Sequence, residues 1–227
     1  MSGTEVREVR FQASSSAGDT SAILLLPAAA KALFVLGHGA GAGMRHPFME
    51  TLADLMAVRQ LATFRYQFAY MERGGRRPDP QPILLATVRS ALRAAVAEAP
   101  GLPTFAGGKS MGGRMSSLAA AASPPERVRG LVFFGFPLHP SGKPSTDRAV
   151  HLAEVGRPML FLQGTRDRLA DLELLGPVCE GIGPAATLHV VDGADHSFQV
   201  LKRSGRSTAE VFEELVDTTE RWAAPYL

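Results

Sequence analysis

A serine flanked by glycines is the first feature of the sequence that could perform chemistry. Residues 108–112 read Gly-Lys-Ser-Met-Gly and match the pattern G-x-S-x-G, with Ser110 at its centre. In this pattern the serine occupies a tight turn between a strand and a helix, and the glycines remove side chains that would clash there. The spacing of a phosphate-binding loop is absent. The pattern therefore predicts that Ser110 is a nucleophile.

An acid and a histidine follow the serine in the order that one type of catalytic triad requires. Asp167 stands a few residues after the apolar run 159–162, and His196 stands at a matching distance after the run 188–191. In that type the chain order is serine, acid, histidine. The histidine takes the hydroxyl proton, and the carboxylate fixes the tautomer of the imidazole. We predict that Ser110, Asp167 and His196 form a triad.

Other acids and histidines meet these requirements less well. Asp171 is placed to begin a helix, and Asp192 and Asp195 are too close to His196 along the chain for the usual geometry. The latter two acids and His196 could surround a metal, but no H-E-x-x-H pattern or paired cysteines accompany them, so no metal is predicted. The other histidines fall in a strand, in loops or in weakly patterned segments: His38, His46, His139, His151 and His189.

A glycine-rich turn follows an earlier apolar run, and residues 33–43 read L-F-V-L-G-H-G-A-G-A-G. The order G-x-G-x-x-G of a dinucleotide-binding loop is absent. Acyl transfer needs two backbone N–H groups aimed at the oxyanion, one from the residue after the nucleophile and one from such a loop. We assign them to Met111 and Ala40, with Gly41 as the alternative to Ala40. His38 is expected to organise the loop rather than to act as a base.

Residues that contact the substrate are harder to identify from the sequence. His38, Gly39 and Gly41 belong to the glycine-rich turn, and Arg73 belongs to the segment 70–77, which reads Y-M-E-R-G-G-R-R. These four residues are predicted to lie near the substrate. The arginines of the segment could recognise a carboxylate or a phosphate, although a solvated basic loop explains them better.

The elements that must position these residues alternate along the chain. Short apolar runs alternate with helix-like segments, and this pattern predicts an α/β fold with a mostly parallel central sheet and helices on both faces. Ligands of such sheets bind beyond the carboxyl ends of the strands, which is where the candidate residues stand. Strands are predicted at residues 6–13, 20–26, 32–36, 62–66, 104–106, 130–134, 159–162 and 188–191. Helices are predicted at residues 47–59, 82–98, 111–121, around 171–181 and at 207–222.

Composition limits the possible functions. The chain has 227 residues and is 45% hydrophobic, which suits one domain spanning residues 1–227. The net charge of +2 gives no case for nucleic-acid binding, and no apolar run approaches the roughly 20 residues that span a membrane. The N-terminus lacks the layout of a signal peptide, and the single cysteine, Cys179, allows no internal disulfide. We expect a cytoplasmic protein without a membrane partner; the sequence predicts no oligomeric state.

Four separated motifs together resemble small α/β-hydrolases of the dienelactone-hydrolase-like branch. They are H-G-A-G at His38, G-K-S-M-G-G at Gly108, G-T-R-D at Gly164 and D-G-A-D-H-S-F at Asp192. The first two also resemble monoacylglycerol-lipase-type enzymes, in which the matching alanine and the residue after the serine supply the oxyanion amides. Those lipases carry a helical cap, but the corresponding interval 135–157 is short here, so no large cap domain is expected. Dienelactone hydrolases proper use cysteine where this chain has serine.

The elbow and the acid motif are most similar to an uncharacterised bacterial branch of the superfamily, whose animal relatives include subunits of chromatin-modifying complexes. The resemblance therefore leaves two functions open. The first is a serine hydrolase that cleaves a small carboxylic ester through an acyl-serine intermediate without a cofactor. Thioesterase, peptidase and acyltransferase chemistry share that step. The second is a non-catalytic scaffold or interaction module built on the same fold.

Overall fold

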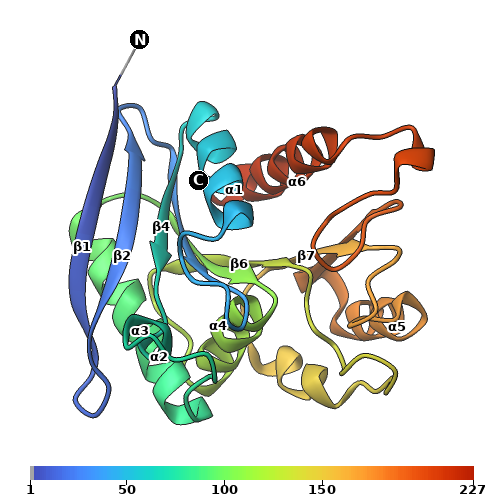
Figure 1. Cartoon of the computed structure of the whole chain (residues 1–227), viewed down its shortest axis with the longest axis horizontal. Coiled ribbons are helices and arrows are strands. Elements are labelled where there is room, and N and C mark those ends of the chain that lie inside the picture. The colour runs from blue at the N-terminus through green and yellow to red at the C-terminus, as the bar shows by residue number, and fades with distance from the viewer. Residues whose placement is uncertain (1–2) are drawn as a thin grey trace.

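The computed structural model describes residues 3–227, and its strands form one eight-stranded sheet (Figure 1). Its strand order is β1-β2-β4-β3-β5-β6-β7-β8. β1 and β2 form an antiparallel hairpin, β2 pairs antiparallel with β4, and the neighbours from β4 to β8 are parallel. The predicted α/β class with a mostly parallel central sheet is confirmed. The strands are β1 (Thr4–Ser14), β2 (Gly18–Pro27), β3 (Ala32–Gly37), β4 (Leu61–Tyr66), β5 (Thr104–Lys109), β6 (Val128–Phe134), β7 (Met159–Gly164) and β8 (Ala186–Val191).

Helices cover both faces of this sheet. Figure 1 shows α1 and α6 on one side and α3, α4 and α5 on the other. Proline starts α1 and stands in the first turn of α3, where its missing N–H costs nothing. The side chains of Asp171 and Ser207 cap the amides at the starts of α5 and α6. The α-helices are α1 (Pro47–Val58), α2 (Ala69–Glu72), α3 (Gln81–Glu98), α4 (Met111–Ala122), α5 (Leu172–Ile182) and α6 (Thr208–Ala223).

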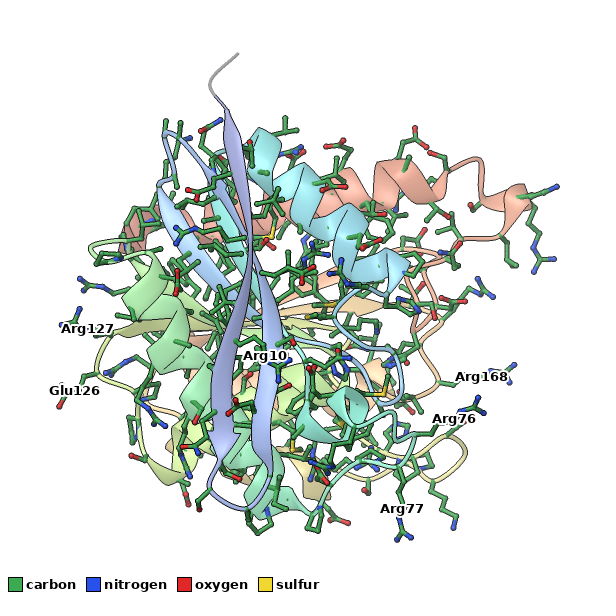
Figure 2. The ribbon with its side chains drawn as sticks, turned by 60° about the vertical axis from the view of Figure 1, so that its left-hand side comes forward. Arg10, Arg76, Arg77, Glu126, Arg127 and Arg168 are labelled. Atoms are coloured by element: carbon green, nitrogen blue, oxygen red, sulfur yellow. The ribbon has the colours of Figure 1, made fainter. Side chains whose placement is uncertain are left out.

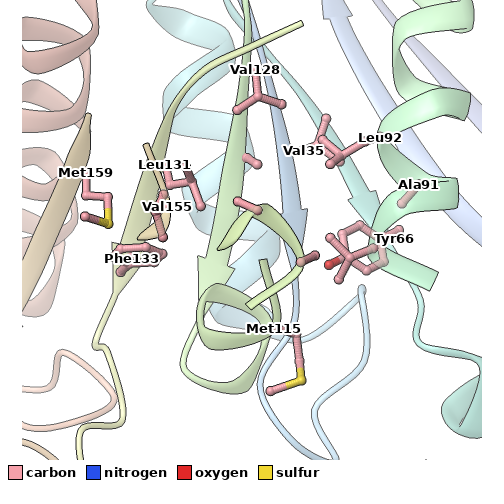
Figure 3. Close-up of a cluster of buried hydrophobic side chains, with 14 of the residues drawn as sticks. Val35, Tyr66, Ala91, Leu92, Met115, Val128, Leu131, Phe133, Val155 and Met159 are labelled. Carbon is pink, nitrogen blue, oxygen red and sulfur yellow. The ribbon is translucent and has the colours of Figure 1, made fainter. Parts of the chain in front are cut away.

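Two apolar clusters hold the helices to the sheet. On the α3 and α4 face, Leu92 and Met115 pack with sheet residues such as Phe133 (Figure 3). On the other face, Phe48 of α1 and Leu215 of α6 pack against the remaining strand side chains. Strands β3 to β7 are buried almost throughout because helices cover both of their faces.

The structure also contains elements that the sequence pattern did not predict. The four-residue helix α2 is too short to show a helical period, and a 3-10 helix occupies Asp147–Glu154 in the interval where no large cap was expected. Among residues 3–227 no separate cap domain is present, as predicted. β8 is an edge strand and is largely half-exposed rather than buried. Within the same residues, no helix is long and apolar enough to cross a membrane.

A close approach between α4 and β3 fixes the turn that carries Ser110. A Cβ added to Gly112 would lie 2.1 Å from the carbonyl oxygen of Gly37, and one added to Gly108 would lie at the same distance from that oxygen. Any side chain at either position would force β3, β5 and α4 apart. The glycines therefore permit the helix to start directly against the sheet.

Candidate active site

Ser110 lies on the turn between β5 and α4, as the sequence predicted. Its backbone angles are φ 50° and ψ −113°, in a region that non-glycine residues rarely adopt. The hydrogen bond from the Ser110 amide to the Phe134 carbonyl, 3.1 Å long, holds the turn against β6. This strained conformation sets the partly exposed serine at the carboxyl end of the sheet, directly before the N-terminus of α4.

The structure brings Ser110, His196 and Asp167 together from three different loops. His196 Nε2 lies 2.9 Å from Ser110 Oγ, and His196 Nδ1 lies 2.7 Å from Asp167 Oδ2. An ionised carboxylate only accepts hydrogen bonds, so Nδ1 carries the proton and donates a hydrogen bond to Asp167. Nε2 is then the acceptor for the Ser110 hydroxyl. This is the geometry that the spacing of the three residues predicted.

Two further groups orient the carboxylate of Asp167, whose side chain is only 1% exposed. The Leu169 amide donates to Oδ1 at 2.8 Å, and Gln163 Nε2 donates to Oδ2 at 2.5 Å. The Phe136 amide donates to Oε1 of Gln163, which turns the Nε2 end of that side chain toward Asp167. Gln163 was not singled out from the sequence. The sequence signal that could have identified it is a polar residue near the end of an otherwise apolar strand.

The glycine-rich turn after β3 lies beside the serine. Gly39 and Ala40 line the same cleft as Ser110. Among residues 3–227, the Ala40 and Met111 amides have no hydrogen-bond partner. The Gly41 amide is not free, because it donates a hydrogen bond to the Tyr70 hydroxyl at 2.9 Å. The structure therefore favours Ala40 over Gly41 as the second oxyanion donor.

His38 is fully buried beneath this turn and organises it. Nε2 of His38 accepts a hydrogen bond from the Phe68 amide, so Nδ1 carries the proton and donates to the Gly39 carbonyl at 2.7 Å. Burial lowers the pKa of His38 from 6.5 to about 4, which keeps the ring neutral at neutral pH. His38 thus supports the turn from below and does not line the cleft.

The cleft above the serine has a volume of about 690 Å³. Ser110 and His196 lie in its wall, next to the first turns of α1 and α6. Apart from Lys109 and two histidines, the side chains around it are uncharged, and no carboxylate lines it among the described residues. The apolar part of the wall consists of Ala42, Pro47, Phe48, Met49, Leu169, Ala209 and Phe212.

The arginines after β4 lie outside this cleft. Arg73 forms an ion pair with Asp79 at 2.7 Å and donates to the Ala17 carbonyl. Arg76 and Arg77 are exposed, and Figure 2 shows both side chains reaching outward from the ribbon. Arg73 was predicted to lie near the substrate, but it does not line this cleft. Arg76 and Arg77 form the exposed basic loop that the sequence favoured.

The sheet order, the turn at Ser110 and the Ser–His–Asp contacts are those of the α/β-hydrolase fold. A family model described as an alpha/beta hydrolase domain matches residues 30–224, so the chain belongs to this family.

Solved structures with the same fold cover nearly the whole chain. A dienelactone hydrolase from Anabaena variabilis is 19% identical with a TM-score of 0.76, covering 99% of each chain. A serine hydrolase without a lid from Xanthomonas campestris is 19% identical with a TM-score of 0.74, covering 97% of this chain and 96% of the other. A cold-adapted esterase from an Arctic intertidal metagenomic library is 22% identical with a TM-score of 0.68, covering 97% of each. At these identities the likeness establishes the fold.

Proposed function

We propose that this protein is a serine hydrolase that cleaves a small carboxylic ester through an acyl-serine intermediate. The observation that carries the proposal is the continuous chain of hydrogen bonds from Ser110 through His196 to the buried Asp167, opening on a cleft. Structural relatives named as an esterase, a serine hydrolase and a dienelactone hydrolase support it.

The first half of the reaction forms the acyl-enzyme. Ser110 Oγ attacks the ester carbonyl carbon while His196 Nε2 takes the hydroxyl proton. Asp167 stabilises the resulting imidazolium through its hydrogen bond to Nδ1. The Ala40 and Met111 amides hold the negative oxygen of the tetrahedral intermediate. The intermediate then collapses, and His196 gives its proton to the departing alkoxide.

The second half releases the acid. A water molecule takes the place of the alcohol, and His196 removes its proton as the water oxygen attacks the acyl carbon. The tetrahedral intermediate collapses, His196 returns the proton to Ser110 Oγ, and the carboxylic acid leaves. No step requires a metal or an organic cofactor.

The test combines an active-site probe with a variant of the nucleophile. A fluorophosphonate should label the wild-type protein, and p-nitrophenyl esters should be turned over. Ser110→Ala should lose both, because it removes the atom that forms the acyl-enzyme. Its free energy of unfolding should change by about 1 kcal/mol or less, since only one partly exposed hydroxyl is deleted.

Two results would point elsewhere. If wild-type protein takes no label and turns over no small ester or thioester, the non-catalytic scaffold becomes the better explanation. If Ser110→Ala keeps wild-type turnover, another residue is the nucleophile.

A further inference from the structure

Lys109, directly before the candidate nucleophile, is a buried lysine inside an apolar surrounding. It is the last residue of β5, and only 9% of its surface is exposed. Its ammonium lies 5.6 Å from the ring centroid of Phe48 and 5.4 Å from that of Phe198. A Cβ added to Gly135 would lie 3.0 Å from Nζ and 3.4 Å from the imidazole of His196, so the ammonium and the imidazole share one small space.

The ammonium of Lys109 has one hydrogen-bond acceptor among the described residues, the backbone carbonyl of His196, at 2.5 Å. Ser110 Oγ, on the next residue of the chain, contacts the imidazole of the same histidine. Lys109 and the next residue, Ser110, therefore both bond to His196. Lys109 bonds to its backbone carbonyl, and Ser110 bonds to its imidazole. Within residues 3–227, no other hydrogen bond joins His196 to β5.

The loop that carries His196 is also held by internal hydrogen bonds and by bonds to the segment after β7. Arg166 donates from its amide to the Ala194 carbonyl and from its side chain to the Gly193 carbonyl, and the Gly193 amide donates to Thr165 Oγ1. The Asp195 carboxylate accepts from the amides of Ser197 and Gln199, and the Phe198 amide donates to the Asp195 carbonyl. Phe198 has a φ of 59°, a conformation that needs support from its surroundings. Among the described residues, none of these bonds reaches β5. The Lys109 ammonium supplies that connection.

Burial of the Lys109 ammonium carries a desolvation penalty. Burial lowers the pKa of Lys109 from 10.5 to about 8, although the carboxylates of Asp167 and Asp195 attract the charge. The rings of Phe48 and Phe198 attract the cation through their π faces, but neither carries a negative charge. An apolar side chain of similar length would pack between the two rings without this penalty. Stability alone thus does not explain the ammonium.

We propose that Lys109 is a positioning residue, whose ammonium holds the His196 carbonyl so that the imidazole stays within reach of Ser110. It acts through His196 and needs no contact with the substrate. The inference rests on the proposed hydrolase function, since it assigns Lys109 a part in preparing the base.

The decisive variant is Lys109→Met, which removes the ammonium and keeps a flexible side chain between the two rings. kcat for p-nitrophenyl butyrate and the rate of fluorophosphonate labelling should both fall by about tenfold to a hundredfold, as for a small misplacement of a catalytic group. KM should stay within about twofold, because every other residue that lines the cleft is unchanged. The melting temperature at pH 7 should be equal or higher, since a buried charge is removed. Lys202→Met, the same change at an exposed lysine after the loop, should leave kcat, KM and melting temperature unchanged.

Unchanged kcat and labelling in Lys109→Met would overturn the proposal. A rate loss accompanied by a lower melting temperature would also overturn it, because that result marks a structural lysine.

Hydrogen exchange of the Ser197 and Gln199 amides gives a second measurement that does not depend on activity. Exchange should accelerate by about tenfold or more in Lys109→Met, since the loop is released from β5. Wild-type protein that is inert to esters and probe would refute the proposed function, and equal exchange rates in the two proteins would refute the tether.

Discussion

At the level of single residues, the site depends on which atoms carry protons. The Leu169 amide requires an acceptor at Oδ1 of Asp167, while Gln163 and His196 both donate to Oδ2. A carboxylate satisfies all three donors at once. An amide cannot, because one of its two ends is itself a donor. The tautomer of His196, and with it the basicity of Nε2 toward Ser110, is therefore fixed by groups that never touch the substrate.

Asp167→Asn tests this reasoning. The new amide must keep its oxygen toward Leu169, which turns its NH₂ group toward Nδ1 of His196 and forces the opposite tautomer. Nε2 then carries the proton and cannot accept one from Ser110, so kcat should fall by about ten-thousandfold. The measurement is turnover of p-nitrophenyl butyrate with folding checked by circular dichroism. Asp171→Asn, which replaces one N-cap of α5 by an equivalent one, should keep full activity. A drop of less than tenfold for Asp167→Asn would remove Asp167 from the triad.

Stability in acid should depend on His38. Its pKa is lowered from 6.5 to about 4 by burial, so between these values the unfolded chain takes up a proton that the folded protein refuses. His38 therefore lowers stability progressively as the pH falls from 6.5 to 4, by up to about 3 kcal/mol, since one pKa unit corresponds to 1.36 kcal/mol. Urea unfolding at several pH values measures the loss. In NMR titration the His38 ring should stay neutral down to about pH 4, and titration near 6.5 would contradict the assignment.

At the level of elements, apolar runs and capping residues in the sequence were enough to predict every strand of the sheet and the five longer helices. The features that the sequence did not predict depend on tertiary contacts. The strand at 104–106 continues to Lys109, because Gly108 and Lys109 pair with Phe133 and Phe134 of β6 even though glycine and lysine are poor strand formers. Gln163 and Lys109 escaped notice for the same reason. Their importance comes from partners that lie far away along the chain.

The close contact between α4 and β3 leaves no room for a side chain at Gly112. Gly112→Ala would place its Cβ 2.1 Å from the Gly37 carbonyl oxygen, so α4 must shift away from the sheet and carry Ser110 with it. The variant should lose several kcal/mol of stability, about the upper part of the range for single substitutions, and nearly all activity. Gly181→Ala, in α5 with nothing within 4 Å of the new atom, should instead gain about 0.5–1 kcal/mol. Equal melting temperatures for the two variants would show that the close approach is not rigid.

At the level of the whole molecule, the cleft is assembled from segments far apart in the sequence. The turn after β3, the first turns of α1 and α6, and the loops after β7 and β8 all contribute to it. The sequence predicted the strand-end positions but could not predict that α1 and α6 begin beside each other there, since this depends on how both helices pack on one face of the sheet. That the 227 residues form one domain stays a prediction.

The size of this cleft should determine which acyl chains are accepted. No separate cap covers it among residues 3–227. Phe212 of α6 lines its apolar part, with its ring centroid 5.1 Å from that of Phe48. Acetyl and butyryl p-nitrophenyl esters should therefore be preferred over long-chain esters in kcat/KM.

Phe212→Leu should move that preference toward longer chains. The shorter side chain opens space beside Phe48 that extra methylene groups can fill, and each buried methylene contributes about 0.8 kcal/mol, or close to a fourfold gain in kcat/KM. The exchange should cost about 1–2 kcal/mol of stability, because Phe212 is largely buried. Leu201→Ala, which shortens an exposed side chain outside the cleft, should leave the chain-length profile unchanged. If the Phe212 variant keeps the wild-type profile, the acyl chain lies elsewhere, and the apolar wall between α1 and α6 does not select it.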